Sequence, residues 1–293
     1  MAEGKIIKSL SGFYYVLNED GITRCRGRGV FRKNKITPLV GDEVVFEAGE
    51  DTEGYIMEVK PRKNELVRPP ISNVDQAILV FSAAEPDFSA SLLDRFLVLI
   101  EANDIKPVIV ITKMDLLSAG TKEEIERYAE DYRAAGYDVL LVSNLTGEGI
   151  TKIKPFLKDR ITVAAGQSGV GKSSLLNTLI PDLDLETSMI SESLGRGKHT
   201  TRHVELIDYN GGLIADTPGF SSLDFQDIEA EDLTFYFPEM RERLNDCKFR
   251  GCIHINEPKC AVKRAVDEGE IPIYRYEHYK AFFNEIKDQK RRY

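Results

Sequence analysis

The chain has 293 residues, of which 42% are hydrophobic and 30% charged, so it is expected to be globular rather than disordered or fibrous. Its apolar stretches, such as Phe96 to Ile100, are far shorter than the roughly 18 residues that a membrane span needs, and residues 1–20 lack the pattern of a cleaved signal peptide. The net charge of −9 argues against a simple nucleic-acid binder, but it is unevenly spread: 0 over residues 1–67, −13 over 68–239 and +4 over 240–293.

Residues 1–67 are predicted to form a small β-barrel. Runs rich in aromatic and β-branched residues alternate with turn formers, over residues 12–17, 43–46 and 55–59. This favours an oligonucleotide-binding barrel, although another small barrel or a sandwich would have the same periodicity. The stretch 22–41 has no acidic residue and is a candidate phosphate-binding patch, with basic side chains at Arg24, Arg26, Arg28, Arg32, Lys33 and Lys35. Residues 64–70, which end in two prolines, are predicted to be a linker.

Residues 68–222 are predicted to form an α/β domain. Apolar strand-like runs, at residues 77–81, 108–111, 139–142, 161–165, 204–207 and 213–215, alternate with helical patterns, at residues 92–101, 122–135, 150–157 and after Gly171. This alternation indicates a mainly parallel sheet with helices on both faces. Residues 223–293 are mostly helical in pattern, so the predicted fold class is a multidomain α/β protein of three parts.

A phosphate loop of the pattern G-x-x-x-x-G-K-[ST] occupies residues 166–173, between a predicted strand and a predicted helix. Its glycines let backbone N–H groups face the phosphates, and the start of the helix adds its positive end. Lys172 is expected to reach the β- and γ-phosphates and to act in catalysis, and Ser173 to ligate Mg²⁺. The expected nucleotide-binding residues of this segment are Gly166, Gln167, Ser168, Gly169, Val170, Gly171, Lys172, Ser173 and Ser174.

A second motif, Asp216-Thr-Pro-Gly219, follows the phosphate loop at the end of another predicted strand. Asp216 is expected to hold Mg²⁺ through water, and the Gly219 N–H to sense the γ-phosphate.

A third motif, at residues 112–115, is predicted to read a guanine base. The Asp115 carboxylate could accept hydrogen bonds from guanine N1 and N2, which adenine does not offer, while Lys113 stacks along the base plane. Thr112 and Met114 complete the motif, and Ser143, with Asn144 after it, ends the next strand and is also expected to touch the base. The alternative is an ordinary loop in which Asp115 caps a helix.

The order of these motifs is unusual. In ordinary GTPases the phosphate loop comes first, then D-x-x-G and then N-K-x-D, whereas here the base-reading residues 112–115 precede residues 166–173. The same pocket can form only if the chain is circularly permuted. The permutation connects the phosphate-sensing segment after Asp216 directly to residues 223–293.

The segment 195–202, Gly-Arg-Gly-Lys-His-Thr-Thr-Arg, is predicted to be a switch whose threonine closes on Mg²⁺. Thr201 is the expected ligand, with Thr200 as the alternative. Phe220 lies where many GTPases place a water-orienting glutamine, and an apolar ring cannot orient water. Slow intrinsic hydrolysis is therefore expected, with His199 as the local catalytic candidate and an ordinary loop histidine as the alternative.

Three of the four cysteines crowd into residues 247–260, and with one histidine they give the spacing C-x₄-C-x-H-x₅-C. Three thiolates and an imidazole would complete a closed tetrahedral Zn²⁺ site with structural rather than catalytic character, at Cys247, Cys252, His254 and Cys260. The alternative is three unrelated thiols. Beyond the cluster, residues 274–293 interleave aromatic and basic side chains, which indicates either an RNA-binding surface or a packed amphipathic helix.

Together, the barrel, the permuted motifs TKMD, GQSGVGKSS, GRGKHTT and DTPGF, and the cluster CKFRGCIH…C resemble the ribosome small subunit-dependent GTPase A family (RsgA, also called YjeQ or YloQ). The resemblance extends over essentially the whole chain. It implies an oligonucleotide-binding barrel over residues 1–67, a circularly permuted G domain over 68–222 and a zinc-binding helical domain over 223–293.

The resemblance also implies a cytoplasmic GTPase that uses GTP/GDP, Mg²⁺ and one structural Zn²⁺. It would act late in maturation of the small (30S) ribosomal subunit, bind its 16S rRNA and be stimulated by that subunit. The chain is expected to be a monomer with no membrane or DNA partner. The alternative function is a non-catalytic, GTP-gated RNA-binding checkpoint; an ATP-using enzyme is disfavoured by Asp115.

The sequence departs from the common GTPase pattern at Thr112, where GTPases generally have asparagine. An asparagine would connect the base-reading loop to the phosphate loop through its side chain. The shorter threonine is expected to do so less well and thereby to weaken the affinity for guanine nucleotides.

Overall fold

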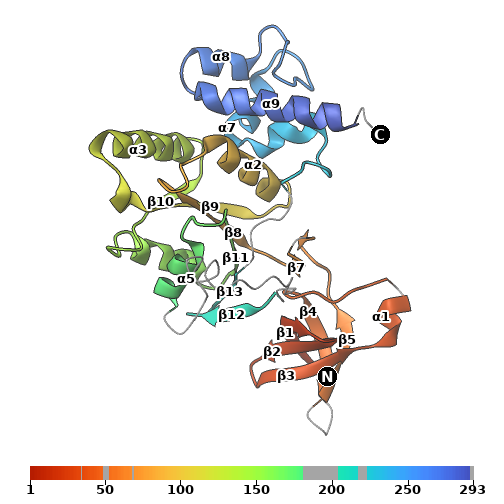
Figure 1. Cartoon of the computed structure of the whole chain (residues 1–293). Coiled ribbons are helices and arrows are strands. Elements are labelled where there is room, and N and C mark those ends of the chain that lie inside the picture. Colours follow the sequence, from red (N-terminus) through yellow and green to blue (C-terminus); the bar gives the residue numbers. More distant parts are fainter. Residues whose placement is uncertain (34, 49–52, 68, 181–203, 217–222, 291–293) are drawn as a thin grey trace.

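A computed structural model describes residues 1–33, 35–48, 53–67, 69–180, 204–216 and 223–290 of the chain. The side chains of Arg32, Asp216 and Lys290 are not among the described atoms. An N-terminal barrel and a group of C-terminal helices lie at opposite ends of the molecule, with an α/β sheet between them (Figure 1).

The N-terminal part is a closed five-stranded barrel with strand order β1-β2-β3-β5-β4. Its elements are β1 (Ala2–Leu10), β2 (Phe13–Asn18), β3 (Gly21–Gly27), α1 (Gly29–Lys33), β4 (Glu43–Ala48) and β5 (Glu53–Val59). Alternate side chains point inward, and Ile6, Val16, Phe46 and Ile56 are almost completely buried. This is the predicted oligonucleotide-binding type of barrel, with one short helix between the third and fourth strands.

The segment expected to be a linker connects the barrel to the central sheet, and residues on both sides of it are bonded to the barrel. β6 (Glu65–Leu66) pairs antiparallel with β7 (Ile71–Ser72). The fully buried Asp42 carboxylate accepts hydrogen bonds from the Ser72 hydroxyl at 2.6 Å and from the Arg62 guanidinium at 2.7 Å. These buried charge-assisted bonds fix the chain on both sides of residues 64–70. They depend on tertiary contacts, which the local sequence around the two prolines does not indicate.

The central sheet has the order β10-β9-β8-β11-β13-β12. Its strands are β8 (Gln76–Ser82), β9 (Lys106–Thr112), β10 (Asp138–Leu141), β11 (Ile161–Ala165), β12 (Leu206–Tyr209) and β13 (Gly212–Asp216). All neighbouring pairs are parallel except β12 with β13. The strand runs and the mainly parallel pairing agree with the sequence prediction.

Helices cover both faces of this sheet, as predicted. Alternate residues of β8 divide between two cores, because successive side chains of a strand point to opposite faces. Ala77, Leu79 and Phe81 pack with α2 (Ala90–Glu101) and α3 (Ala119–Ala134). On the opposite face, Ile78 and Val80 pack with η2 (Ile150–Ile153), α4 (Lys154–Leu157) and α5 (Lys172–Leu179).

The C-terminal part is helical and packs on α2 (Figure 1). It comprises η3 (Ala230–Tyr236), α7 (Pro238–Arg241), η4 (Leu244–Asp246), α8 (Ala261–Asp267) and α9 (Ile273–Lys290). Along α9 the side chains of Tyr276, Tyr279, Phe282 and Phe283 are at most 8% exposed. The packed-helix interpretation of these aromatic residues is therefore correct, because buried rings have no face to offer to RNA bases. None of the helices in the described ranges has the length and apolarity to cross a bilayer.

A buried ionic network joins the C-terminal helices to the α/β domain. Arg275 of α9, 2% exposed, donates hydrogen bonds to Asp94 of α2 and to both carboxylate oxygens of Glu239, in α7, at 2.8 and 2.9 Å. Asp94 also accepts a 2.7 Å bond from the Tyr132 hydroxyl and lies 2.6 Å from Nδ1 of His278. Since loss of one partner would leave a buried charge uncompensated, this network fixes the two parts against each other.

Candidate nucleotide-binding and metal sites

Four parallel strands deliver the predicted nucleotide motifs to one edge of the sheet. Thr112 ends β9, Ser143 follows β10, residues 166–173 follow β11 and Asp216 ends β13. Parallel strands place their carboxyl ends at the same edge, which is where ligands bind in α/β sheets. The permuted order along the chain is thus compatible with one site in space.

The phosphate loop connects the buried strand β11 to α5, and its glycines meet two different requirements. Gly169 and Gly171 have φ of +82° and +89°, in the left-handed region that favours glycine. At Gly166 the reason is close approach, because a Cβ would lie 2.2 Å from the Val80 carbonyl oxygen. The Val170 side chain is buried beneath the loop, and Lys172 begins the helix. This is a backbone shape in which N–H groups can turn toward phosphates.

The base-reading loop is held by hydrogen bonds from neighbouring residues. Lys113 adopts the left-handed conformation with φ of +59°, and its ammonium group donates to the Glu85 carbonyl. Ser143 is 1% exposed; its hydroxyl donates to Oδ1 of Asp115 and accepts from the Thr146 N–H at 3.1 Å. Ser143 therefore orients the carboxylate that is expected to read guanine. The contact between Lys113 and the Glu85 carbonyl could not be predicted from the sequence, because it depends on how the loop after β8 packs.

Two side chains connect the base-reading loop to the phosphate loop. Thr112 is completely buried, and its hydroxyl lies 2.6 Å from the Val170 carbonyl oxygen. The Asn144 side-chain amide donates to the Gly171 carbonyl at 3.1 Å. The connection expected of an asparagine at position 112 is thus present, although its effect on nucleotide affinity stays a prediction. The sequence singled out Asn144 beside the base, but this contact to the phosphate loop appears only in the structure.

Most of the residues expected to complete the phosphate and Mg²⁺ site belong to segments that the structure does not describe. His199, Thr200, Thr201, Gly219 and Phe220 lie outside the described residues. Asp216 is described as the last residue of β13, but its side chain is not. Gln167 and Ser168 are exposed at the tip of the phosphate loop, and Met114 packs partly against the hydrophobic core.

The predicted zinc ligands come together in the C-terminal part. The ligand atoms of Cys247, Cys252, His254 and Cys260 lie within 4.8 Å of one another. Nδ1 of His254 is 3.1 Å from Sγ of Cys260 and 3.7 Å from Sγ of Cys247. Three soft sulfur donors and one imidazole nitrogen, mostly buried, fit a closed tetrahedral Zn²⁺ site.

Burial controls the protonation of this cluster when no metal is bound. It raises the pKa of the Cys252 thiol to about 12 and lowers the pKa of His254. A neutral imidazole suits a ligand, whereas the buried thiol becomes a thiolate only if a cation compensates its charge.

The loops around the cluster are fixed by the neighbouring helix and by one carboxylate. The hydroxyl of Tyr276 donates to the His254 carbonyl at 2.6 Å, and that of Tyr279 to the Ile253 carbonyl at 2.8 Å. The Glu257 carboxylate accepts backbone N–H bonds from residues 253, 255 and 256, at 3.0 to 3.1 Å. Burial alone would raise the pKa of Glu257, but these bonds outweigh it and the pKa is lowered.

The basic patch of the barrel is partly neutralised in three dimensions. Arg24 and Arg26 both form ion pairs with Glu53 on the adjacent strand, and both guanidinium groups lie 4.6 Å from the Phe13 ring centroid. Among the described side chains of the patch, the remaining cations are exposed and form no ion pair with a described residue: Arg28, Lys33 and Lys35. These three are the better candidates for phosphate contacts.

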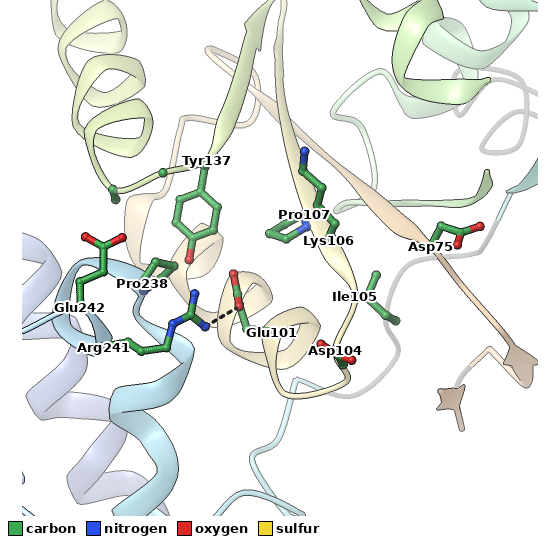
Figure 2. Close-up of a pocket in the computed structure, with 12 residues that line it drawn as sticks. Asp75, Glu101, Asp104, Ile105, Lys106, Pro107, Tyr137, Pro238, Arg241 and Glu242 are labelled. Carbon is green, nitrogen blue, oxygen red and sulfur yellow. Dashed lines mark ion pairs between the residues drawn. The ribbon is translucent and has the colours of Figure 1, made fainter. Parts of the chain in front are cut away.

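A separate cavity of about 470 Å³ lies where the α/β domain meets the C-terminal helices (Figure 2). It opens at the amino edge of the sheet, near the start of β9 at Lys106, and contains none of the predicted nucleotide or zinc residues. Arg241 pairs there with Glu101 at 3.5 Å, and the Tyr137 side chain points toward this pair (Figure 2). Burial raises the pKa of Glu101 even though Arg241 opposes the shift.

Comparison with known proteins gives consistent matches over the full chain. The family model described as RsgA GTPase matches residues 59–226, and the model of the RsgA N-terminal domain matches residues 3–56. The chain is 68% identical over 293 residues to a protein of Bacillus cytotoxicus and 64% identical over 298 residues to one of Bacillus subtilis, with complete coverage of both chains in each case. Both relatives are named small ribosomal subunit biogenesis GTPase RsgA.

Two solved structures have the same fold. The crystal structure of YloQ, described as a circularly permuted GTPase, has a TM-score of 0.87 at 60% identity and covers 99% of this chain and 96% of its own. The crystal structure of YjeQ from Thermotoga maritima has a TM-score of 0.86 at 39% identity, covering 97% and 98% of the two chains.

Proposed function

The chain belongs to the RsgA GTPase family, and from that membership we propose that it hydrolyses GTP to GDP during late maturation of the small ribosomal subunit. The observation that best supports this proposal is the joining of the phosphate loop to the base-reading loop. The 2.6 Å contact between Thr112 and Val170 connects two segments that lie 58 residues apart in the sequence and whose order the permutation reverses. This contact supports a common site in which one loop would bind phosphate and the other would read guanine.

Each nucleotide-site residue has a proposed role. Lys172 would hold the β- and γ-phosphates, and Ser173, Thr201 and Asp216 would hold Mg²⁺, the last through water. Asp115, oriented by Ser143, would read the guanine N–H groups. His199 is proposed as the group that assists hydrolysis. The bound Mg²⁺ would supply charge stabilisation for phosphoryl transfer.

The remaining parts of the proposal concern zinc, partners and location. The cluster of Cys247, Cys252, His254 and Cys260 would hold one structural Zn²⁺. The names of the relatives support the small subunit, with its 16S rRNA, as the partner. We further propose that the protein acts in the cytoplasm as a monomer, without membrane or DNA partners.

The test of this function is GTP turnover by the purified protein with small subunits, with large subunits and with neither. Slow basal hydrolysis, accelerated by small subunits only, is the expected result. Acceleration by both would contradict the small subunit as the specific partner, and acceleration by neither would contradict subunit-stimulated hydrolysis. Single-turnover hydrolysis on small subunits also tests the checkpoint alternative, which the apolar Phe220 motivates. That alternative predicts subunit binding that depends on GTP but no accelerated cleavage.

Replacing Asp115 with asparagine is expected to weaken GTP binding and to relax discrimination against xanthine nucleotides. Xanthine presents an acceptor where guanine has its N2 amino group, and an amide can donate to that acceptor whereas a carboxylate cannot. Competition of GTP and XTP against a fluorescent GDP analogue measures both affinities. If both affinities equal those of the unmodified protein, Asp115 does not read the base.

The exposed cations of the barrel are expected to bind rRNA phosphates. The triple substitution R28E/K33E/K35E should weaken small-subunit binding and flatten its salt dependence, since each phosphate contact contributes about 0.7 to 0.9 to the logarithmic salt slope. Basal GTP hydrolysis should survive, because these residues lie far in sequence from the nucleotide motifs and on a separate barrel. Stimulation by the subunit should be lost.

A matched control is available in the α/β domain. K152E/K154E/K158E changes the charge by the same amount at three exposed lysines in and beside η2 and α4. This control should leave subunit binding nearly unchanged. Equal losses in the two triple variants would mean that net charge, rather than the barrel patch, determines binding.

A further inference from the structure

Asn144 lies between the two loops of the nucleotide site and contacts the phosphate loop through its side chain. Its amide nitrogen donates to the Gly171 carbonyl at 3.1 Å. The same carbonyl accepts the Leu175 N–H at 2.8 Å, the bond that begins α5. The Gly171 carbonyl is therefore held from two sides. A Cβ added to Gly171 would come within 3.1 Å of the Asn144 amide, so no larger residue fits between them without a shift.

Thr112 donates to the preceding carbonyl and has no second proton to donate to another. Its hydroxyl lies 2.6 Å from the Val170 carbonyl oxygen and 3.1 Å from that of Phe81. Both are acceptors and a hydroxyl has one proton, so the shorter contact to Val170 is the hydrogen bond. Thr112 therefore holds the Val170 carbonyl, and the next carbonyl, that of Gly171, is left to Asn144.

The orientation of the Val170 and Gly171 carbonyls also determines the direction of the N–H groups of Gly171 and Lys172. In a planar trans peptide the C=O and N–H bonds point in opposite directions. Fixing the Val170 carbonyl on the side of Thr112 turns the Gly171 N–H to the other side, and fixing the Gly171 carbonyl does the same for the Lys172 N–H. In a phosphate loop these backbone N–H groups are phosphate ligands. Since Lys172 is expected to reach the β- and γ-phosphates, these two N–H groups are expected to serve the β-phosphate.

We propose that Asn144 is a positioning residue for the β-phosphate: it orients the Lys172 N–H, Thr112 orients the Gly171 N–H, and together they replace the asparagine that is missing at position 112. The inference rests on the proposed guanine-nucleotide function and deepens it. Oδ1 of Asn144 is buried and has no hydrogen-bond partner among the described residues. It remains an acceptor for a hydroxyl or water donor that arrives with the nucleotide.

The test compares GDP with GMP, which lacks the β-phosphate, by competition against a fluorescent GDP analogue. Asn144→Ala should lower the affinity for GDP about fivefold, the effect of one net hydrogen bond, and leave that for GMP unchanged. Asn144→Asp keeps the side-chain size but places a carboxylate oxygen against the Gly171 carbonyl, and it should lose more GDP affinity than the alanine variant. The ratio of GDP to XDP affinity should not change, because Asp115 is intact.

Asn103→Ala is the matched control, since Asn103 likewise donates its amide to a backbone carbonyl, that of Leu99, at 2.8 Å near the end of α2. It should bind both nucleotides like the unmodified protein. Equal losses for GDP and GMP, or unchanged GDP binding in both Asn144 variants, would overturn the assignment to the β-phosphate. Failure of the unmodified protein to bind GDP would instead contradict the proposed function itself.

Discussion

Replacing Lys172 with alanine is expected to abolish GTP turnover. Lys172 is the first residue of α5, directly after the left-handed Gly171, so its side chain starts at the mouth of the phosphate loop. Each charge-assisted hydrogen bond to a phosphate is worth about 1.5–3 kcal/mol in binding. A further loss follows in the transition state, where the charge on the transferring phosphoryl group must be stabilised. Turnover should therefore fall by at least about a thousandfold, measured as phosphate release at saturating GTP.

The matched control for this experiment is Lys152→Ala, which removes an exposed lysine from η2 in the same domain. It should hydrolyse GTP at the rate of the unmodified protein. Thermal unfolding of both variants confirms that the domain is folded. Near-normal hydrolysis by a folded Lys172→Ala protein would refute the assignment of residues 166–173 as the phosphate loop.

Replacing Cys252 with serine is expected to remove the zinc and to unfold the segment around it. Cys252, His254 and Cys260 are buried in a segment that consists mostly of loops. Over residues 242–270, every one of which the structure describes, η4 and α8 are the only helices. Structural zinc contributes roughly 10–16 kcal/mol of apparent free energy to small domains of this kind. Metal analysis should find one zinc per chain in the unmodified protein and none in the variant.

Hydrogen exchange shows how far this unfolding extends. Protection should fall over residues 240–265 and at the part of α9 whose Tyr276 hydroxyl bonds to the His254 carbonyl. Protection of β11 and α5, and the affinity for GDP, should persist, because these elements belong to a separate core. Cys25→Ser is the control: Cys25 is a buried cysteine in the barrel, outside the cluster, and its loss should not change the zinc content. Absence of zinc from the unmodified protein would disprove the site.

The sequence by itself determined the parts of this protein that depend on short-range backbone geometry. Residues 166–173 can be recognised because glycine is required where φ is positive or the backbone approaches closely, as at Gly171 and Gly166. The strands were predictable because the central residues of β8, β9 and β11 are buried on both faces and are mostly apolar. The order of the motifs was enough to infer the circular permutation.

Long-range contacts modified two expectations that rested on local composition. The patch at residues 22–41 contains no acid in the sequence, yet Glu53 on the neighbouring strand pairs with Arg24 and Arg26. Residues 64–70 have the composition of a linker, yet the buried Asp42 holds this connection through Arg62 and Ser72. In both cases the deciding partner lies on another element, and local composition carries no information about it.

Only the tertiary structure decided how the two halves of the nucleotide site are joined and how the C-terminal helices are held. Thr112 is hydrogen-bonded to Val170, which is 58 residues away in the sequence, and Arg275 is hydrogen-bonded to Asp94, which is 181 residues away. The pattern of residues 274–293 allowed either a surface for RNA or a packed helix, and the burial of the α9 aromatic side chains in the folded protein favoured the second. A side chain's role in such places depends on which element the fold brings opposite to it, and that is determined by packing of the whole core rather than by neighbouring residues.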